Sequence, residues 1–370
     1  MPGSLVDRFG IEVPIFAFSH CRDVVVEVTR AGGMGVLGAA WMTTDELEAS
    51  LKWIDDRVNG KPYGVDVVFP GTFAAIDGTE DLTGLLPDTH VRFVREMLAR
   101  AGVAPLPDDQ IAEFMHETAA KMAMTPQKSE RCLEVCLAHP VKFVVGAMGV
   151  PPKRVIDAVH AKGIPIGALV GNAKHALKQR DAGIDVIIAQ GAEAGGHTGN
   201  ISSLVLWPQI VDAVAPLPVL AAGGIGRGRQ IAAAMATGAA GVWMGSIWLG
   251  TTESELTPQM REQLFAASSE DAVISYSMSG KRNRMLRSKY TEAWDRPEAP
   301  QPLTFPLQSI LSGEPFRRAE RSNRLEYWTY SVGQIVGEMK HETTVRQVFS
   351  ELLNEYLEAA EMAGALIRGS

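Results

Sequence analysis

The chain has 370 residues, 46% hydrophobic and 21% charged, the balance of a globular protein with a large core. Its formal net charge is −8, and polyanion binding needs clustered Lys and Arg, so we expect neither nucleic acid nor an anionic membrane as a partner. No segment approaches the roughly 18 apolar residues of a membrane span, and the N-terminus lacks the pattern of a secretion signal. We therefore expect a cytoplasmic protein.

The three cysteines form no framework of pairs. Cys132 and Cys136 lie one turn apart in a helical segment, and no His or Cys follows at a spacing typical of zinc sites. We expect packed thiols and no metal site.

Eight short apolar runs alternate with amphipathic stretches along the first 250 residues. Continuous apolar runs are typical of strands buried on both faces, as in parallel sheets. The runs are Ile15–Phe18, Met34–Gly38, Tyr63–Phe69, Val141–Ala147, Ile164–Val170, Val186–Gln190, Val219–Ala222 and Gly241–Gly245. The predicted helices between them are Asp23–Ala31, Thr44–Asn59, Pro151–Ala161, Ala173–Ala182, Leu204–Val214 and Gly228–Thr237. This order predicts a (β/α)8 TIM barrel over residues 1–250, with an open doubly wound sheet as the alternative.

Two parts exceed the barrel. Residues from about 70 to 140, after the third strand, form a proline-punctuated helical insertion that we expect to lie over one mouth. Residues 251–370 are expected to form a mostly helical C-terminal extension packed on the barrel, with a final helix at roughly 325–366.

A glycine turn follows each of the last two strands, in Ala221-Ala-Gly-Gly-Ile225 and Met244-Gly-Ser-Ile-Trp248. Glycine lets backbone N–H groups approach an anion closely, and a following helix start adds a favourable dipole. Paired turns after strands seven and eight are typical of the phosphate site of this fold, so we predict a phosphate-bearing ligand.

The sixth strand leads into Gln190-Gly-Ala-Glu-Ala-Gly-Gly-His-Thr-Gly199. Glycines around one imidazole leave the ring accessible, and a histidine pKa suits proton transfer near neutrality. His197 is therefore the predicted catalytic residue. The other histidines, apart from His20, lie in helical or loop contexts without such neighbours.

This run, with Ala-Ala-Gly-Gly-Ile and Met-Gly-Ser after it, resembles the nitronate monooxygenase family, formerly 2-nitropropane dioxygenases. Residues 279–287 and the final helix are also similar to that family. The resemblance implies an FMN cofactor, with Gln190, Gly195 and Gly196 at the flavin and its ribityl chain, and His197 beside it. It assigns the FMN phosphate to Gly223, Gly224, Met244, Gly245 and Ser246.

The sequence departs from the family pattern at two flavin-facing places. Phe18, Ser19 and His20 stand where the family has Ala-Pro-Met or similar, and Asp66 stands in place of an Asn. An ionised Asp66 would disfavour the anionic reduced flavin and lower its potential. His20 is interpreted as catalytic, as an ion-pair partner of Asp66, or as structural.

The resemblance implies an oxidoreductase that oxidises alkyl nitronates with O2 to a carbonyl compound and nitrite. The alternative is a reductase on the same scaffold that takes NAD(P)H as a transient co-substrate and reduces an enoyl thioester of CoA or ACP, or a quinone. A run of basic residues could then bind the phosphates of a CoA thioester or a pyridine nucleotide, or it could be a solvated charged face. The run comprises Lys281, Arg282, Arg284, Arg287 and Lys289.

Two further hypotheses stay open: a flavin-free barrel with a catalytic thiol at Cys21, and a flavoprotein without catalysis. The expected partners are a small-molecule substrate and O2, and association into a homo-oligomer is left open.

Overall fold

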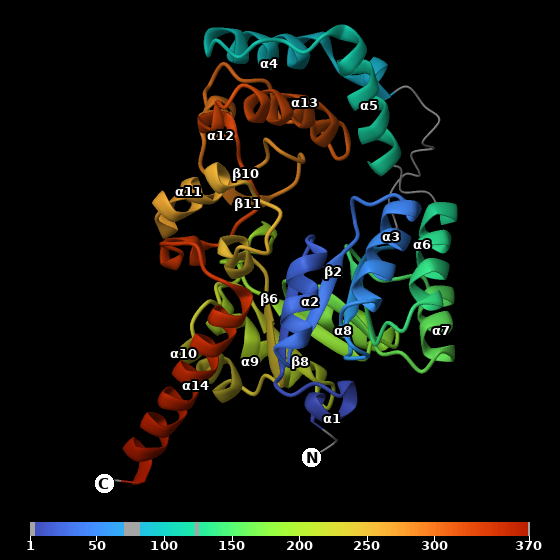
Figure 1. Ribbon diagram of the computed structural model, residues 1–370, viewed down its shortest axis with the longest axis vertical. Coiled ribbons are helices and arrows are strands. Elements are labelled where there is room, and N and C mark those ends of the chain that lie inside the picture. The colour runs from blue at the N-terminus through green and yellow to red at the C-terminus, as the bar shows by residue number, and fades with distance from the viewer. Residues whose placement is uncertain (1–3, 70–81, 123–125, 369–370) are drawn as a thin grey trace.

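The computed structural model describes residues 4–69, 82–122 and 126–368. Eight parallel strands close into one barrel, because β1 pairs with both β2 and β9 (Figure 1). They are β1 (Ile15–Ser19), β2 (Met34–Gly38), β3 (Gly64–Val68), β4 (Phe143–Ala147), β5 (Ile166–Val170), β6 (Val186–Gln190), β8 (Val219–Ala222) and β9 (Gly241–Met244). Closure confirms the predicted (β/α)8 barrel over the open sheet.

Helices cover the outside of the barrel. They are α2 (Arg22–Arg30), α3 (Thr44–Asp55), α6 (Pro126–Ala138), α7 (Lys153–Ala161), α8 (Ala173–Asp181), α9 (Ser203–Val214) and α10 (Gly228–Ala236). Helix α6 packs against α3 and α7, so it holds the place of the barrel helix between β3 and β4. The buried Cys132 and Cys136 lie in α6, which confirms their expected role in packing.

Strand alternation divides the buried side chains into two cores. Phe16 of β1 packs inside the barrel, whereas its neighbours Ile15 and Ala17 pack against the helices. Helix α1 (Leu5–Phe9) closes one end of the barrel, where the Phe9 ring lies 5.4 Å from Phe16 and 5.0 Å from Phe143. The opposite end, at the carboxyl ends of the strands, is the mouth.

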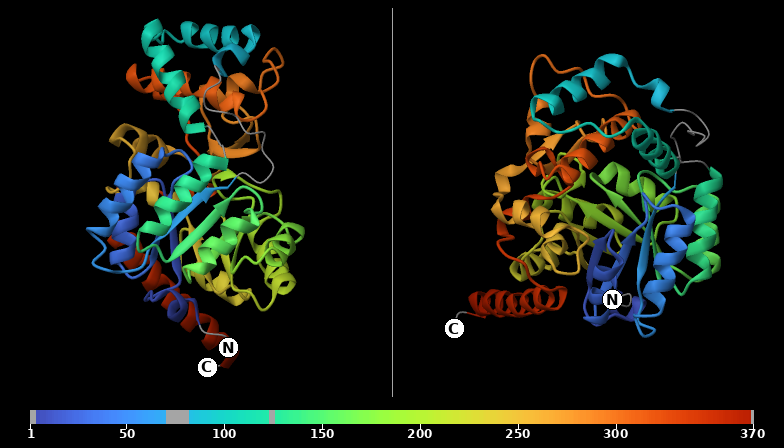
Figure 2. Two further views of the ribbon diagram at one scale, coloured as in Figure 1. Left: turned by 90° about the vertical axis from the view of Figure 1, so that its right-hand side faces the viewer. Right: turned by 45° about the horizontal axis from the view of Figure 1, so that its top comes forward.

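The insertion and the C-terminal extension together cover the mouth side, as Figure 2 shows from two further directions. The insertion contains η1 (Leu82–Leu85), α4 (Asp88–Arg100) and α5 (Asp108–Met122). After β9 follow η2 (Ser246–Gly250), α11 (Pro258–Ala266), η3 (Ser269–Asp271), β10 (Ala272–Ser275), β11 (Asn283–Leu286), α12 (Lys289–Trp294), α13 (Leu307–Arg321), η4 (Leu325–Tyr327), η5 (Gln334–Glu338) and α14 (Val345–Arg368). Helix α13 packs against α4 and α5.

Two features of the extension differ from expectation. Strands β10 and β11 join β7 (Gly196–His197) in a small sheet, which the sequence did not predict because each strand is only two to four residues long. The final helix begins at Val345, so the predicted start near residue 325 is wrong. Residues 325–344 instead form short 3-10 turns and extended backbone that cross the barrel loops.

Within the described ranges, no helix is both long and apolar enough to cross a membrane.

Candidate active site at the barrel mouth

The inner face of the barrel changes from apolar to polar at the mouth. By strand alternation Phe18 and Gln190 face inward, as the interior residues of their strands do. Asp66 also faces inward, because its neighbours Val65 and Val67 pack in the outer core. Phe18 stacks on Trp243 with ring centroids 5.9 Å apart. Gly38 makes room for this arrangement, since a Cβ there would lie 2.7 Å from the Phe18 ring.

The imidazole of His20 is fixed against the neighbouring strand. Its Nδ1 lies 2.8 Å from the Gly38 carbonyl oxygen, which can only accept, so Nδ1 carries a proton. The His20 ring meets Phe18 edge-on at 5.1 Å. Among the residues that the structure describes, no ion pair joins His20 to Asp66, so the ion-pair interpretation is not supported.

Asp66 is buried in the barrel interior, with 5% of its surface exposed. Its Oδ1 has no hydrogen-bond partner in the described part of the chain. Burial raises the pKa of this carboxyl to about 8, because no cation offsets the loss of hydration. The side chain is therefore mostly neutral at pH 7, so burial opposes the negative charge considered from the sequence.

His197 lies on β7, which pairs with β11 so that His197 stands opposite Asn283. Its Nε2 lies 2.9 Å from Oγ of the buried Ser279. Burial, and secondarily the charge of Lys281, lower the His197 pKa to about 4. The ring is neutral at pH 7. Ser279 was not identified from the sequence, because it lies 82 positions away and only its family-like segment drew attention to it.

The first glycine turn is tightly built. Gly223 and Gly224 have φ of 106° and 69°, which favour glycine, and a Cβ on Gly223 would lie 2.7 Å from Ser203 Oγ. The start of α10 is already occupied, however. Gln230 Oε1 accepts from the N–H groups of residues 226 and 227, and Glu355 of α14 accepts from Gly228 N–H at 2.8 Å. The expected contribution of these helix amides to an anion site is therefore not supported.

The second turn has more room. A Cβ on Gly245 would meet only Phe18, at 3.8 Å or more, so packing alone does not demand glycine there. Ser246 Oγ accepts from Gly333 N–H at 2.8 Å, which leaves its own proton available. The Met244 side chain packs in the outer core, so only its backbone can serve the mouth.

The extended stretch before α14 crosses the loop after β6. A Cβ on Gly195 would lie 2.7 Å from Gly333 N, and one on Gly333 would lie 2.6 Å from the Glu193 carbonyl oxygen. Gln334 N–H donates to that same oxygen at 3.0 Å. Gly195 is thus required by a close backbone crossing, whereas Gly196, with φ of 79°, has open space beside it.

Ser19 and Cys21 serve the turn into α2. Ser19 Oγ accepts from Cys21 N–H at 3.0 Å, and Ser19 has the parity of the outer core, so its side chain faces away from the mouth. Cys21 Sγ donates to the Glu253 carbonyl at 3.0 Å, and burial raises the thiol pKa to about 11. A thiol held protonated is a poor nucleophile, which argues against the catalytic-cysteine hypothesis.

The side chains of the basic run at residues 281–289 have different surroundings in the structure. The buried Arg284 donates to the carbonyls of Ala192 and Ala272, so it holds the sheet to the barrel rather than facing a ligand. Arg287 pairs with Asp271, and Lys289 lies 3.8 Å from Glu326, with both side chains about half exposed. Arg282 adjoins Asn283, the residue opposite His197, and Lys281 is the member whose charge acts on the His197 ring.

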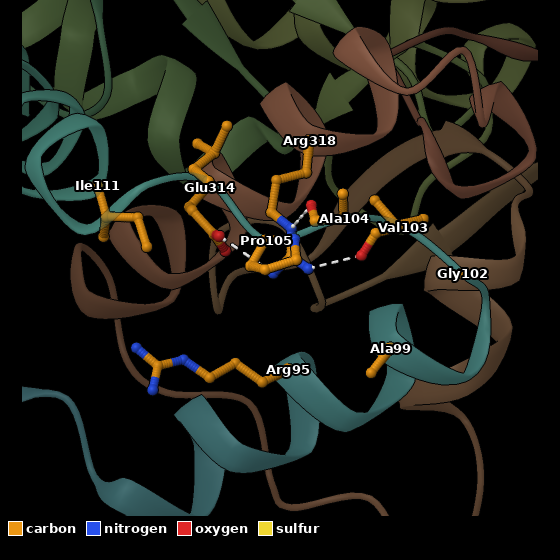
Figure 3. Close-up of a pocket in the computed structure, with 10 residues that line it drawn as sticks. Arg95, Ala99, Gly102, Val103, Ala104, Pro105, Ile111, Glu314 and Arg318 are labelled. Atoms are coloured by element: carbon orange, nitrogen blue, oxygen red, sulfur yellow. Dashed lines mark hydrogen bonds and ion pairs between the residues drawn. The ribbon is translucent and has the colours of Figure 1, made fainter.

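A pocket of about 590 Å³ lies away from this mouth, between α4, α13 and the loop that joins α4 to α5 (Figure 3). Arg318 crosses beside it and donates to the carbonyls of Val103 and Ala104, at 2.9 and 3.0 Å, and to Glu314. The pocket therefore belongs to the contact between insertion and extension, and no predicted site residue lines it.

Comparisons with known proteins agree with the geometry. Residues 94–355 match the family model described as nitronate monooxygenase. A Mycobacterium tuberculosis protein named "Putative monooxygenase" is 41% identical over 374 residues, covering 98% of this chain and 99% of that protein. A "Probable nitronate monooxygenase" of Staphylococcus haemolyticus is 26% identical and covers 88% and 89%. The solved nitroalkane oxidase of Streptomyces ansochromogenes superposes with a TM-score of 0.76 at 24% identity, covering 98% and 100%.

The closed barrel, the half-buried histidine at its mouth and these relatives define a flavin-dependent (β/α)8-barrel oxidoreductase. The chain belongs to the nitronate monooxygenase family. Within the part of the chain that the structure describes, its mouth fits a flavin in three respects: the inward-facing Asp66 has an unpartnered buried oxygen, Gly245 leaves open space, and the Ser246 hydroxyl accepts a hydrogen bond without donating one.

Proposed function

We propose that this protein binds FMN and oxidises alkyl nitronates with O2, releasing a carbonyl compound and nitrite. The observation that carries the proposal is the neutral, half-buried His197, which Ser279 holds by a hydrogen bond at the mouth of a family-typical barrel. A nitronate is an anion, so a mouth suited to it should present hydrogen-bond donors and no uncompensated negative charge. The neutral Asp66 and the nearby Lys281 meet that requirement.

The FMN phosphate would lie on the two glycine turns, against Gly223, Gly224, Gly245, Ser246 and the backbone of Met244. Gln190 and Gly196 would adjoin the flavin and its ribityl chain. Phe18 would form an apolar wall, with His20 and Asp66 beside it as polar contacts. Ser19 and Gly195 are supporting residues in this proposal, because each is already committed to a contact within the protein.

When bound, the flavin supplies the electron transfer that side chains cannot. This chain contributes orientation and electrostatics. His197, neutral at pH 7, offers a hydrogen bond to a substrate oxygen. The apolar pair Phe18 and Trp243 excludes water from the inner end of the mouth, and exclusion of water strengthens every polar contact there.

The test is anaerobic mixing of the purified, FMN-loaded protein with propionate 3-nitronate in one cell and with NADH or NADPH in another, followed by flavin absorbance. Bleaching by the nitronate, with nitrite and a carbonyl product formed once O2 is admitted, is the expected result. Failure to take up FMN would overturn the cofactor assignment. Bleaching by the nucleotide alone would overturn the substrate assignment in favour of the reductase, and enoyl-CoA esters and quinones would then be tested as acceptors.

A further inference from the structure

We infer that Ser279 is a positioning residue that donates its hydroxyl proton to Nε2 of His197, so that the histidine carries its own proton on Nδ1 and meets its ligand as a hydrogen-bond donor. The expected effect of Ser279 on kcat rests on the proposed function, whereas the position of the proton on the His197 ring does not.

The hydrogen bonds around Ser279 determine this direction. Its Oγ lies 2.9 Å from His197 Nε2, and it also accepts a weak hydrogen bond from Lys281 N–H at 3.4 Å. The alternative acceptor for the hydroxyl proton is the Lys281 carbonyl, at 3.5 Å and therefore at the limit of a hydrogen bond. The proton is placed best on the line to Nε2, and a neutral imidazole that accepts at Nε2 must be protonated at Nδ1.

Among the described residues, the hydrogen bond to Ser279 is the one that His197 makes through its side chain. Lys281 is the charged group that acts on the ring, and its positive charge opposes a second proton. From β11, the facing residue is the uncharged Asn283, so no carboxylate on the paired strand favours an imidazolium.

Ser279 is itself held in place by the C-terminal extension. Two side chains of α13 donate to the carbonyls just before it: Gln308 Nε2 to Ser277 O at 2.6 Å and Ser312 Oγ to Met278 O at 2.8 Å. Further along the same helix, Arg318 binds the loop after α4 (Figure 3). One helix thus connects the insertion to the residue that orients His197.

The direct test is long-range ¹H–¹⁵N NMR of the flavin-free protein labelled in histidine, with the His197 signals assigned by their loss in His197→Asn. The wild type should show the Nδ1–H tautomer at neutral pH. In Ser279→Ala the His197 ring should lose its preference for the Nδ1–H tautomer. The His197 pKa should rise, because the neutral ring no longer accepts a stabilising hydrogen bond at Nε2. Ser279→Thr should restore the wild-type pattern, and Ser275→Ala, a buried serine bonded to Ser277, should leave it unchanged.

In the loaded enzyme, Ser279→Ala should lower kcat roughly 5- to 100-fold, the range for losing one buried hydrogen bond. Ser312→Ala should give a smaller loss in the same direction. An Nε2–H tautomer in the wild type, or a tautomer and pKa unaffected by Ser279→Ala, would overturn the inference. A normal NMR result with no turnover of nitronates would instead count against the proposed function alone.

Discussion

At the scale of single residues, burial decides the charge of two side chains at the mouth. His197 and Asp66 would both be ordinary titrating groups in water, but desolvation disfavours the charged form of each. A base becomes harder to protonate and an acid harder to ionise, so both are neutral near pH 7. The site is polar without being charged at these two positions.

Asp66→Asn tests whether Asp66 is neutral in the folded protein, through the pH dependence of the unfolding temperature. Folding raises the pKa of Asp66 from its ordinary value near 4 to about 8. Between these two pH values the folded protein therefore binds the Asp66 proton more tightly than the unfolded chain does. Wild-type stability should therefore fall as pH rises from about 4 to about 8. Asp66→Asn should match the wild type at about pH 4 and exceed its unfolding temperature at about pH 9. Parallel pH dependence of the two melting temperatures would show that Asp66 ionises normally.

His197→Asn tests the catalytic assignment. We expect the variant to retain the flavin, judged by its visible absorbance, and to lose about 10²–10⁴-fold in turnover, typical of removing a proton-transfer or donor group. His20→Asn is the matched comparison, because His20 also lies at the mouth and is tied to Gly38 through Nδ1. Full activity in His197→Asn with loss in His20→Asn would move the catalytic role to His20.

At the scale of elements, the carboxylate of Glu355 forms the polar contacts that join α14 to the start of α10. Glu355 accepts from Gly228 N–H and contacts both Arg227 and Arg229, as close as 2.5 Å. The Arg227 hydrogen bond, aided by Arg229, lowers the Glu355 pKa to about 2. The lowered pKa means that the contact stabilises fully above the unfolded value near 4.3 and is lost as pH falls toward 2.

Glu355→Gln should therefore cost about 1 kcal/mol at neutral pH, a modest value because both guanidinium groups are largely exposed. It should also flatten the loss of stability between about pH 4.5 and pH 2. Hydrogen exchange in residues 345–357 and denaturant unfolding would measure both. Glu351→Gln is the control, because Glu351 lies on the same helix and accepts a hydrogen bond from Gln347, a residue of its own helix. Equal effects of the two substitutions would contradict a specific role for Glu355.

At the scale of the whole molecule, the insertion and the extension are separated by the barrel sequence yet are joined by Arg318. This guanidinium is 4% exposed and binds two carbonyls of the insertion as well as Glu314, whose pKa burial raises. Arg318→Met should destabilise by about 3–5 kcal/mol, because it removes the ion-pair partner of the mostly buried Glu314 carboxylate.

The double substitution Arg318→Met with Glu314→Leu should recover most of that loss, since an apolar pair needs no charge compensation. Limited proteolysis within residues 82–122 should be fast in the single variant Arg318→Met and slower in the double variant, in line with their stabilities. If the single variant is as stable as the wild type, the insertion is held by other contacts.

The sequence by itself determined the barrel, the positions of the two glycine turns and the family. These features are local: an apolar run, a Gly-Gly turn such as Gly223–Gly224, and the ten residues around His197 can be read without knowing what packs against them. The tertiary structure decided the partner of His197, the charge of Asp66 and the path of residues 325–344. Each depends on residues far apart in the chain or on exclusion of water. A local pattern shows neither a long-range pairing nor how completely a single polar side chain such as Asp66 is buried.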